Sequence, residues 1–517
     1  MRGRALSLSL GSLGRDGPHV REMETIYDLI ETAARIDPHK LALVEGERTM
    51  DYGGLLKCAR AIAALLLEAG VEPGGAVGVL FPNSIEYVAA FFGVAAAGGV
   101  VVPLDPSLGP DEMAYVVADS GVRLIVAAPD CATVLEDALA RPCGPPHLVA
   151  LERAEDAVAS VGSGPSVPSR PPRTSDDEAL YLYSTGSTGR PKRVARTHAN
   201  LTTLAENYGG TVGWSAEDGV LFAVPLTHTY ALGNMMGAVW CRCALHLLSQ
   251  FSRRGVLEAL AGRRVTVFPS VPYMLELLAR SVRSAEPPHS LTMVLSAGEP
   301  LHREVYRAFR DAFGVAPRQL YGSTETGVIA VNRAPDVDER WDSVGTPVRG
   351  VEVRVVDEAG SPRERGGRGE IVVRSPFMAR GYSGAAACES ATSFRGGWYW
   401  TGDLGRIDGE GYIYIEGRKR SFINVAGYKV DPLEVEEVLE RHEAVCEAAV
   451  VGARDPRGHE YVKAVVVRED GFEHVGAAEL IEYVRDVLAP YKAPRRVEFI
   501  PELPRSPTGK KLRESLK

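Results

Sequence analysis

Two patterns of hydrophobic and polar positions alternate through most of the chain. Segments with apolar residues at helical spacing are separated by short runs rich in Val, Ile and Leu. The first pattern predicts amphipathic helices, and the second predicts short buried strands. Such alternation favours mostly parallel sheets with helices on both faces, which is an α/β fold. The predicted helices are 24–37, 55–69 and 85–97, and the predicted strands are 76–81, 99–103, 124–127, 179–183, 221–224, 265–268 and 293–296.

The pattern changes towards the C-terminus. Residues 351–415 contain shorter alternating strands and Gly-rich turns, which suit a small β-barrel or an antiparallel layer. A charged joint, Arg418-Lys419-Arg420, then leads into a segment of α+β character. In that segment we expect helices at 433–441 and 478–488 and strands at 448–451 and 462–467.

These changes divide the chain into a large and a small domain. We expect an N-terminal domain over residues 23–417, made of two α/β subdomains and the β-barrel-like part. Residues 418–420 are the expected hinge, and 421–517 are the expected small, mobile C-terminal domain. The first 22 residues are Arg-rich and lack the long apolar core of a signal peptide, so we expect a disordered leader. The Pro/Ser/Gly-rich stretch 158–173 is predicted to be a surface connection.

Composition narrows the class of protein. The 517 residues are 45% hydrophobic and 24% charged, as in ordinary globular proteins. A net charge of -9 and a pI near 5.8 disfavour nucleic acid or an anionic membrane as a partner. The seven cysteines are scattered, and the close pair Cys241 and Cys243 lacks a second pair to complete a zinc site. We therefore expect buried thiols in a reducing, cytoplasmic compartment, and no membrane insertion because no apolar run is long enough to span a bilayer.

One segment has the chemistry of a loop that wraps a polyphosphate. It reads Tyr183-Ser184-Thr185-Gly186-Ser187-Thr188-Gly189-Arg190-Pro191-Lys192. Hydroxyl and backbone N–H groups can donate to phosphate oxygens, glycines allow close approach, and lysine adds positive charge. It is not a Walker A loop, because Lys192 follows Pro191 and no Ser or Thr comes next. A flexible Ser/Gly linker is the alternative, but the predicted strand 179–183 leads directly into this loop.

Two further segments could complete a nucleotide site. In Tyr321-Gly322-Ser323-Thr324-Glu325-Thr326-Gly327, Glu325 is a candidate Mg²⁺ ligand, because such sites take one or two carboxylates with phosphate oxygens. Thr324 could bond a phosphate and Tyr321 could stack on a base, although a simple turn with a surface glutamate is the alternative. After the aromatic cluster 398–400, Asp403 could accept both ribose hydroxyls or could only order its own turn.

Together these segments belong to an ordered set of motifs. The set is 183–192, Leu295-Ser296-Ala297-Gly298-Glu299-Pro300-Leu301, 321–327, 399–403, 417–418, Gly427-Tyr428-Lys429-Val430 and Pro507-Thr508-Gly509-Lys510. With it, the chain from Thr25 onward resembles the adenylate-forming superfamily of acyl- and aryl-CoA ligases, peptide-synthetase adenylation domains and beetle luciferases. The resemblance implies a two-step reaction. A carboxylate attacks the α-phosphate of ATP to give an acyl-adenylate and pyrophosphate, and a thiol then attacks the mixed anhydride to give a thioester and AMP.

The resemblance also implies cofactors and residue roles. The implied cofactors are ATP, Mg²⁺ and coenzyme A, or a carrier-protein phosphopantetheine in place of coenzyme A. Lys510 is implied as the catalytic lysine of the first step, with its neighbour Lys511 less suited, and with Mg²⁺ on Glu325 it would offset the repulsion between two anions. The residues implied to bind ATP or AMP are Ser184, Thr185, Gly186, Ser187, Thr188, Gly189, Lys192, Ala297, Gly298, Glu299, Tyr321, Gly322, Thr324, Asp403 and Arg418.

Family members rotate the small domain between the two steps. By this resemblance Lys510 is withdrawn after the first step, and Gly427 and Tyr428 then face the thiol tunnel. The chain departs from the family pattern at two positions. Arg420 stands where the family usually carries Asp or Lys as the pivot, and Arg193 stands where many relatives have Gly. We expect the second change either to lie on the surface or to alter phosphate access.

The acid side is indicated by Pro225-Leu226-Thr227-His228-Thr229-Tyr230-Ala231-Leu232. It resembles the segment of acyl- and aryl-CoA ligases in which His and Tyr line the carboxylate entrance, so His228 is a candidate catalytic residue and Tyr230 a pocket residue. A core histidine is the alternative for His228. No Asp occurs between Phe222 and Val239 to pair an ammonium group, which disfavours α-amino acids. An aryl or arylalkyl acid is slightly favoured over a fatty acid.

Three functions remain open from the sequence. The first is an acyl- or aryl-CoA ligase. The second is a free-standing enzyme that loads an acyl carrier protein, because both thiols would enter the same tunnel. The third is a nucleotide-binding homologue without catalysis, against which Glu325, Asp403 and Lys510 argue.

Overall fold

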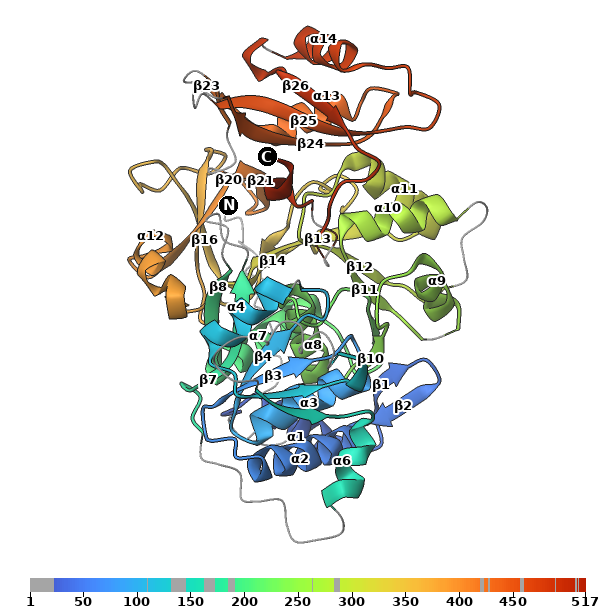
Figure 1. Ribbon diagram of the computed structural model, residues 1–517, viewed down its shortest axis with the longest axis vertical. Helices are drawn as coiled ribbons and strands as arrows, with labels where there is room; N and C mark the ends of the chain where they lie inside the picture. Colours follow the sequence, from blue (N-terminus) through green and yellow to red (C-terminus); the bar gives the residue numbers. More distant parts are fainter. Residues whose placement is uncertain are drawn as a thin grey trace, which may run out of the picture.

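Two large sheets build the N-terminal domain (Figure 1). The computed structural model describes residues 23–108, 110–131, 146–161, 173–184, 191–262, 264–282, 289–418, 423–425, 428–455, 460–488, 490–506, 509 and 511–517. Both sheets are parallel through most of their width and antiparallel at one or both edges. The predicted α/β fold with mostly parallel sheets is therefore confirmed.

The first sheet has nine strands. In spatial order they are β15 (Thr346–Pro347), β14 (Gly327–Val331), β13 (Pro317–Ser323), β12 (Met293–Ser296), β11 (Val267–Ser270), β9 (Gly219–Phe222), β10 (Ala244–Leu247), β1 (Leu41–Glu45) and β2 (Arg48–Asp51).

The second sheet has seven strands. Their order is β18 (Tyr382–Ser383), β8 (Lys192–Thr197), β7 (Glu178–Ser184), β4 (Val100–Leu104), β3 (Ala76–Leu80), β5 (Leu124–Ala127) and β6 (His147–Ala150). The central strands are buried on both faces, which is why they read as unbroken apolar runs.

Helices pack around these sheets. They are α1 (Tyr27–Ile36), α2 (Tyr52–Glu68), α3 (Ile85–Ala96), α4 (Pro110–Ser120), α6 (Ala154–Val161), α7 (His198–Val212), α8 (Thr229–Trp240), α9 (Arg253–Gly262), α10 (Pro272–Ser281), α11 (Arg303–Phe313) and the short α12 (Ser390–Ser393). Short 3₁₀ helices are η1 (Pro129–Cys131), η2 (Gly384–Glu389), η3 (Pro490–Lys492) and η4 (Arg513–Leu516). Within the described ranges, no helix is both long enough and apolar enough to cross a bilayer.

Predicted boundaries differ from the structure where local chemistry overrides the pattern. α2 begins three residues before the predicted 55, because Asp51 caps it by accepting the N–H of Gly54 at 2.7 Å. The predicted connection 158–173 is wrong at its start, since α6 continues through Val161. Residues 162–172 of that connection, and the predicted leader 1–22, lie outside the described residues.

The region predicted as a small β-barrel or antiparallel layer forms a five-stranded antiparallel sheet. Its order is β16 (Glu352–Val356), β17 (Gly369–Arg374), β20 (Trp398–Ile407) and β19 (Phe394–Arg395), and β21 (Ile413–Arg418) also pairs with β20.

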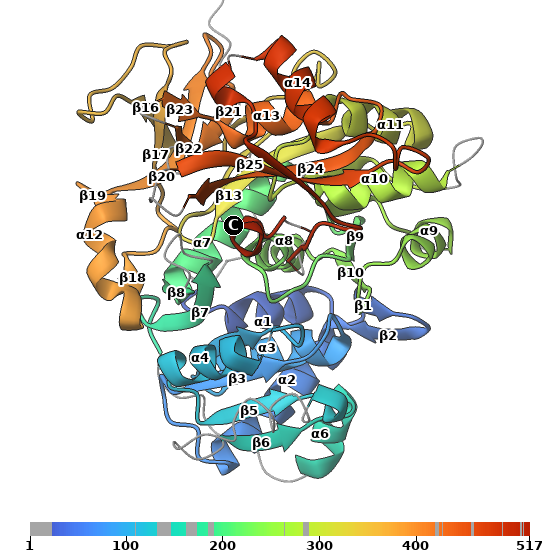
Figure 2. The same ribbon diagram turned by 45° about the horizontal axis from the view of Figure 1, so that its top comes forward.

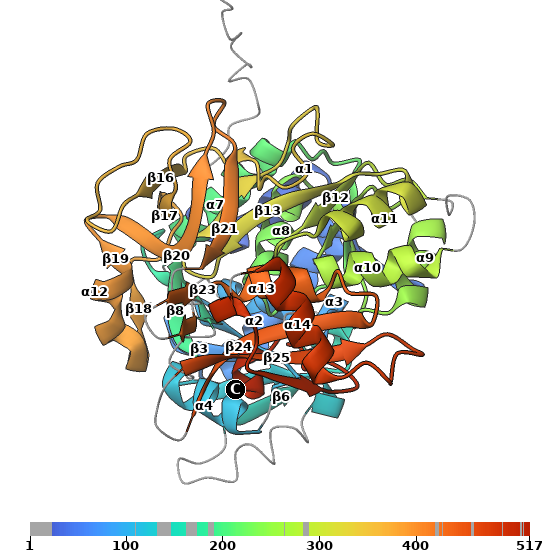
Figure 3. The ribbon, with the colours of Figure 1, turned by 90° about the horizontal axis from the view of Figure 1, so that it is seen from above.

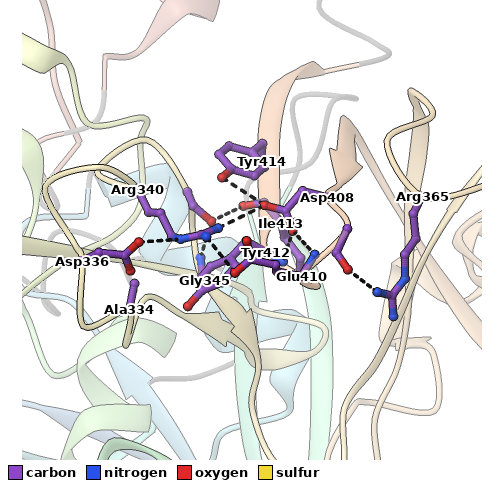
Figure 4. A network of polar contacts seen from close by, with 12 residues as sticks. Ala334, Asp336, Arg340, Gly345, Arg365, Asp408, Glu410, Tyr412, Ile413 and Tyr414 are labelled. Atoms are coloured by element: carbon purple, nitrogen blue, oxygen red, sulfur yellow. Dashed lines mark hydrogen bonds and ion pairs between the residues drawn. The ribbon is translucent and has the colours of Figure 1, made fainter.

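Arg340 anchors the turn between β20 and β21 to the loop that follows β14 (Figure 4). Its guanidinium pairs with Asp408 at 3.3 Å and with Glu410 at 2.8 Å. It also lies 4.1 Å from the ring centre of Tyr412. Beside these contacts, the N–H of Ile413 donates to the carbonyl of Gly345 at 2.8 Å. The β20–β21 hairpin is thereby fixed relative to the nine-stranded sheet.

The smaller C-terminal domain has its own sheet and its own core. The sheet runs β24 (Val445–Arg454), β25 (Glu460–Arg468) and β26 (Arg496–Phe499), with helices α13 (Pro432–Leu439) and α14 (Ala477–Val487) and the hairpin β22 (Ile423–Val425)–β23 (Tyr428–Val430). The core is a separate cluster that includes Val435, Val450, Val466 and Val484. Figures 2 and 3 show this domain beside the five-stranded sheet and beside α10 and α11. A separate core is what a domain that moves as a unit requires.

Candidate active site

The carboxyl ends of three neighbouring parallel strands form one wall of the candidate site. Strands β11, β12 and β13 pair in parallel, with Ser270 opposite Ser296 and Ser296 opposite Gln319. The residues that follow therefore emerge at the same sheet edge: Tyr273 after β11, Ala297–Glu299 after β12, and Tyr321 near the end of β13. Open α/β sheets bind ligands at such carboxyl ends.

Asp403 is held by two partners. The carboxylate is 6% exposed, its Oδ1 accepts from Arg418 Nε at 2.7 Å, and its Oδ2 accepts from the Tyr321 hydroxyl at 2.5 Å. Asp403 and Arg418 face each other in the register of β20 and β21. Burial and the charge of Asp403 raise the pKa of Tyr321 well above its usual range, so the hydroxyl stays a donor. Each carboxylate oxygen keeps acceptor capacity for a further O–H group.

The segment after β12 meets the end of the chain. Gly298 has φ +91°, a conformation that favours glycine. Beside it, Glu299 Oε1 accepts the backbone N–H of Lys511 at 3.1 Å. The predicted adenine-side segment Ala297–Glu299 thus contacts the C-terminal domain directly.

Glu325 lies in the turn between β13 and β14. It is 6% exposed, and its Oε1 accepts from the hydroxyl of Tyr382 at 3.0 Å. Burial, then the charge of Glu325, raises the pKa of both Tyr382 and Tyr399. No cluster of three His, Cys, Asp or Glu side chains able to hold a metal occurs in the described part of the chain. One buried carboxylate fits a Mg²⁺ ion that takes its other ligands from nucleotide phosphates and waters, not an all-protein cage.

The neighbours of Glu325 are shaped for a tight turn. A Cβ on Gly322 would lie 2.5 Å from the carbonyl oxygen of Gly327, so only glycine fits there. Thr324 is half-buried, and its carbonyl accepts from Arg196 Nη1 at 3.1 Å.

The two ends of the predicted phosphate loop lie side by side. Ser184 ends β7, Lys192 begins β8, and the two residues pair in register. The buried Lys192 Nζ lies 2.5 Å from Glu389 Oε2 and 4.9 Å from the ring centre of Tyr382. Because the Tyr382 hydroxyl binds Glu325, one tyrosine links the loop lysine to the candidate metal ligand. The remaining predicted loop ligands, Thr185, Gly186, Ser187, Thr188 and Gly189, lie outside the described residues.

Arg193 is not a surface change, and that alternative was wrong. Its side chain is 16% exposed and lies 3.5 Å from Asp119 at the end of α4. Its Nη1 donates to the Asp119 carbonyl at 2.8 Å and its Nε donates to the Ser383 hydroxyl at 3.1 Å. Asp119 also accepts from Tyr183 at 2.8 Å. Arg193 therefore clamps α4 and β18 to the strand that leaves the phosphate loop.

The last segment of the chain returns to the sheet edge. Arg505 lies 4.3 Å from the ring centre of Tyr273, and a Cβ on Gly509 would lie 3.3 Å from the same ring. Lys510 is outside the described residues, but Gly509 and Lys511 on either side of it contact this wall. The Lys511 ammonium points elsewhere, to Glu440 at 3.1 Å and to the Ala448 carbonyl at 2.8 Å.

The predicted hinge and tunnel residues are described only in part. Arg420 and Gly427 lie outside the described residues, and Tyr428 begins β23 without a described side chain.

The acid-side segment begins α8. His228 caps this helix, and its Nδ1 accepts the N–H of Tyr230 at 3.3 Å. Burial raises the pKa of Tyr230 well above its usual range, against the opposing effect of the Ser270 backbone N–H. The hydroxyl of Thr227 donates to Asp105 at 2.8 Å. The fold thus brings an acidic residue to this segment from the loop after β4, although that carboxylate also binds Ser107 at 2.6 Å.

Sequence reasoning missed the residues that support the site from a distance. Tyr382, Tyr273, Asp105 and Asp119 belong to no motif and reach the site only through tertiary contacts. Arg196 carried a signal, because a charged residue at an inward position of a strand is unusual.

Family models, curated proteins and solved structures that resemble this chain all indicate the same enzyme family. A model described as AMP-binding enzyme matches residues 30–383, and one described as AMP-binding enzyme C-terminal domain matches 434–510. A feruloyl-CoA synthase from an Amycolatopsis species is 35% identical over 490 residues, covering 93% of this chain and 96% of that protein. A fatty acid–[acyl-carrier-protein] ligase from Streptomyces coeruleorubidus is 30% identical, covering 97% and 98%. The crystal structure of the anthranilate CoA ligase AuaEII in complex with anthranoyl-AMP has a TM-score of 0.84 and 27% identity, covering 96% and 97%.

Proposed function

Because this chain belongs to the AMP-binding enzyme family of the adenylate-forming superfamily, we propose that it joins a carboxylic acid to a thiol through an acyl-adenylate. In the first step a carboxylate oxygen attacks the α-phosphorus of ATP and pyrophosphate leaves. In the second step a thiolate attacks the acyl carbon and AMP leaves. The protein is an AMP-forming acid–thiol ligase, and ATP and coenzyme A are its co-substrates. The proposal rests on one observation about the carboxyl ends of β11, β12 and β13. Asp403 bonds Tyr321 there, and the residues on either side of Lys510 contact Glu299 and Tyr273.

The nucleotide would bind along this edge. Asp403 has both oxygens oriented by Tyr321 and Arg418 and can still accept two ribose hydroxyls. The backbone of Ala297–Glu299 would flank adenine. The phosphates would reach the loop between Ser184 and Lys192 and the hydroxyl of Thr324.

Glu325 would hold Mg²⁺. The chemistry supplied there would be positive charge, which would lower the repulsion between the attacking carboxylate and ATP. Tyr382 occupies one oxygen of Glu325 at 3.0 Å and leaves the other available to the ion.

Lys510 would supply the second positive charge of the first step. Its support is the docking of Gly509 against Tyr273 and of the Lys511 N–H on Glu299. Lys511 is disfavoured for this role because its ammonium is engaged by Glu440 and Ala448. A rotation about residues 418–420 would then exchange the Lys510 loop for the Gly427–Tyr428 segment before thiol attack. The separate C-terminal core supports such a movement.

We infer an aryl or arylalkyl acid as the substrate class. The feruloyl-CoA synthase shares more of this sequence than the fatty acid ligase does, and the solved relative holds an aryl adenylate. His228 and Tyr230 begin the helix that would face the acid. A carrier-protein thiol is the second candidate acceptor, favoured by the similarity to the acyl-carrier-protein ligase. A cytoplasmic location fits the free thiols of the described cysteines.

The test is acid-dependent exchange between ATP and labelled pyrophosphate over a panel of aryl, arylalkyl and alkyl acids. We expect exchange with aryl or arylalkyl acids and a loss of about 10²–10³-fold in Lys510→Ala, typical for removal of a transition-state charge. Lys511→Ala is the matched control and should retain most of the exchange. Wild-type exchange in Lys510→Ala would refute the assigned role, and no exchange with any acid would refute adenylate formation. Thioester formation with coenzyme A, compared with a carrier protein, identifies the acceptor.

A further inference from the structure

Arg196 is a fully buried arginine that the proposed reaction does not yet use. It lies in β8, is 1% exposed, and borders a small cavity lined mainly by apolar side chains, among them Leu180, Leu182, Leu201 and Leu204. Burial lowers the pKa of its guanidinium to about 10, and the nearby charge of Glu325 opposes this shift. A buried cation is strongly unfavourable unless it is paired and hydrogen-bonded, so its partners indicate its role.

Those partners surround Glu325. Arg196 Nη1 donates to the carbonyl of Thr324 at 3.1 Å, and Nη2 donates to the carbonyl of Phe377. Thr324 precedes Glu325 in the chain. Phe377 lies two residues before Ala379, whose N–H donates to the carbonyl of Glu325 at 2.8 Å. One guanidinium therefore fastens the two backbone segments between which Glu325 is held.

The turn itself leaves room for this side chain. Gly327 has φ +71°, and a Cβ there would lie 3.3 Å from Arg196 Nη2. Among the described residues, Nε of Arg196 has no hydrogen-bond partner. The orientation of the guanidinium therefore depends on the hydrogen bonds of its two Nη groups and on the nearby charge of Glu325. The geometry needs a planar fork that reaches two carbonyls at once, which arginine provides and lysine does not.

We propose that Arg196 is a positioning residue, which holds the Glu325 carboxylate and the Thr324 hydroxyl in the orientation that Mg²⁺–ATP requires. This inference rests on the proposed role of Glu325. In this role Arg196 acts through the turn that it fastens, at Thr324 and Phe377.

The test compares Arg196→Met and Arg196→Lys with the control Arg318→Met. Arg318 is a half-buried arginine whose Nη1 also donates to two backbone carbonyls, those of Asn332 and Ala334, at 3.2 and 2.8 Å. Binding of Mn²⁺–ATP is measured by calorimetry without acid, and the Mg²⁺ concentration for half-maximal exchange is measured beside the KM for the acid.

We expect Arg196→Met to weaken Mn²⁺–ATP binding and to raise the half-maximal Mg²⁺ concentration about tenfold, because it removes both charged hydrogen bonds that fasten the turn around Glu325. The KM for the acid should change less than about twofold, because both hydrogen bonds of Arg196 go to the backbone around Glu325, at Thr324 and Phe377. Arg196→Lys should fall between Arg196→Met and the wild type, and Arg318→Met should match the wild type. If Arg196→Met does not fold, Arg196→Lys carries the same comparison.

A double variant separates this inference from the proposed function. If Arg196 acts through Glu325, Arg196→Met/Glu325→Gln should be no worse in Mg²⁺ dependence than Glu325→Gln alone. Losses that multiply, or a folded Arg196→Met with wild-type Mg²⁺ dependence, would overturn the inference while leaving Glu325 as a ligand. Wild-type Mg²⁺ dependence in Glu325→Gln would instead remove Glu325 from the metal site, and the role of Arg196 with it, without touching adenylate formation.

Discussion

Tyr273 should control the first half-reaction and not the second. It lies in α10 of the N-terminal domain, under the guanidinium of Arg505 at 4.3 Å and against Gly509. Tyr273→Leu removes this platform but leaves the contacts of Arg505 within its own domain, to Glu447 and to the Gly509 carbonyl. The perturbation is therefore specific to the docked position of the Lys510 loop.

The magnitude follows from the burial of the contact. The Arg505 side chain is 12% exposed, so its attraction to the ring lies towards the desolvated range of about 1–2 kcal/mol. Losing it shifts the ratio of docked to undocked loop about tenfold, since 1.4 kcal/mol corresponds to a factor of ten. The N–H of Lys511 still donates to Glu299 at 3.1 Å, so docking is weakened and not abolished. We expect a fall of about tenfold at most in the rate of adenylation.

The assay measures the two half-reactions apart. Adenylation is followed as pyrophosphate exchange, and thioester formation is followed from isolated acyl-adenylate and coenzyme A. Tyr273→Leu should lower the first rate and leave the second unchanged or faster, because in the proposed reaction the Lys510 loop undocks before thiol attack. Tyr461→Leu is the matched control, since Arg495 lies 5.3 Å from that ring within the C-terminal domain. An equal fall in both half-reactions, or an unchanged exchange rate in a folded variant, would refute the reasoning.

Two further predictions concern stability. Arg193→Met should lower the free energy of unfolding by about 3 kcal/mol in a urea titration, because it leaves the Asp119 carboxylate, which is 8% exposed, without its cation. The control is Arg380→Met, which breaks an exposed ion pair with Asp176 and should cost less than about 1 kcal/mol. Equal losses in the two variants would contradict the argument from burial. Glu276→Gln should stabilise the protein at pH 7, because burial raises the pKa of Glu276 in the folded state despite the nearby Arg280, so ionisation of this carboxyl opposes folding. The gain in stability should fade as pH falls through the raised pKa and should be absent below the usual glutamate value of about 4.5. Thermal unfolding measured as a function of pH checks this prediction. The control is Glu258→Gln on α9, because Glu258 forms an exposed ion pair with Arg254 at the same i,i+4 spacing as Glu276 and Arg280. A Glu276→Gln variant that is less stable than the wild type at pH 7 would contradict the prediction.

The elements of the parallel core were predictable because their signal is local. The strands at 124–127 and 293–296 were predicted with their observed ends, because in each case the pattern in the sequence covers the same residues as the hydrogen-bonded strand. The predicted strand 265–268 is observed two residues later, at Val267–Ser270. Val265 is buried although it lies outside β11, and the apolar pattern in the sequence reflects burial and not membership of a strand. The apolar pattern therefore predicts the presence of a strand more accurately than it predicts the residues at which the strand begins and ends.

The candidate site was predictable only where a motif carries it. Tyr321, Asp403 and Arg418 come from separate motifs, and the structure brings them within hydrogen-bond distance. The supporting contacts had no such signal, because they join residues far apart in sequence. Arg196 meets Thr324 across 128 positions, and Tyr382 meets Glu325 across 57. No periodicity or spacing encodes a pairing that only the assembled sheets create.

The charges along β8 explain why the proposed reaction needs a further lysine from the C-terminal domain. Lys192 and Arg196 share one face of this strand, where Lys192 pairs with Glu389 and Arg196 lies near the charge of Glu325. Arg193 on the other face is matched by Asp119, and Arg418 is matched by Asp403. Each of these four cations has a carboxylate near it, so together they offer little surplus positive charge to a polyphosphate and an approaching acid anion. In the proposed reaction this surplus would come from Mg²⁺ held by Glu325 and from Lys510. The proposed movement of the docked loop after the first step would then withdraw the charge of Lys510 when it is no longer required, because the thiolate would attack an acyl carbon whose leaving group is AMP.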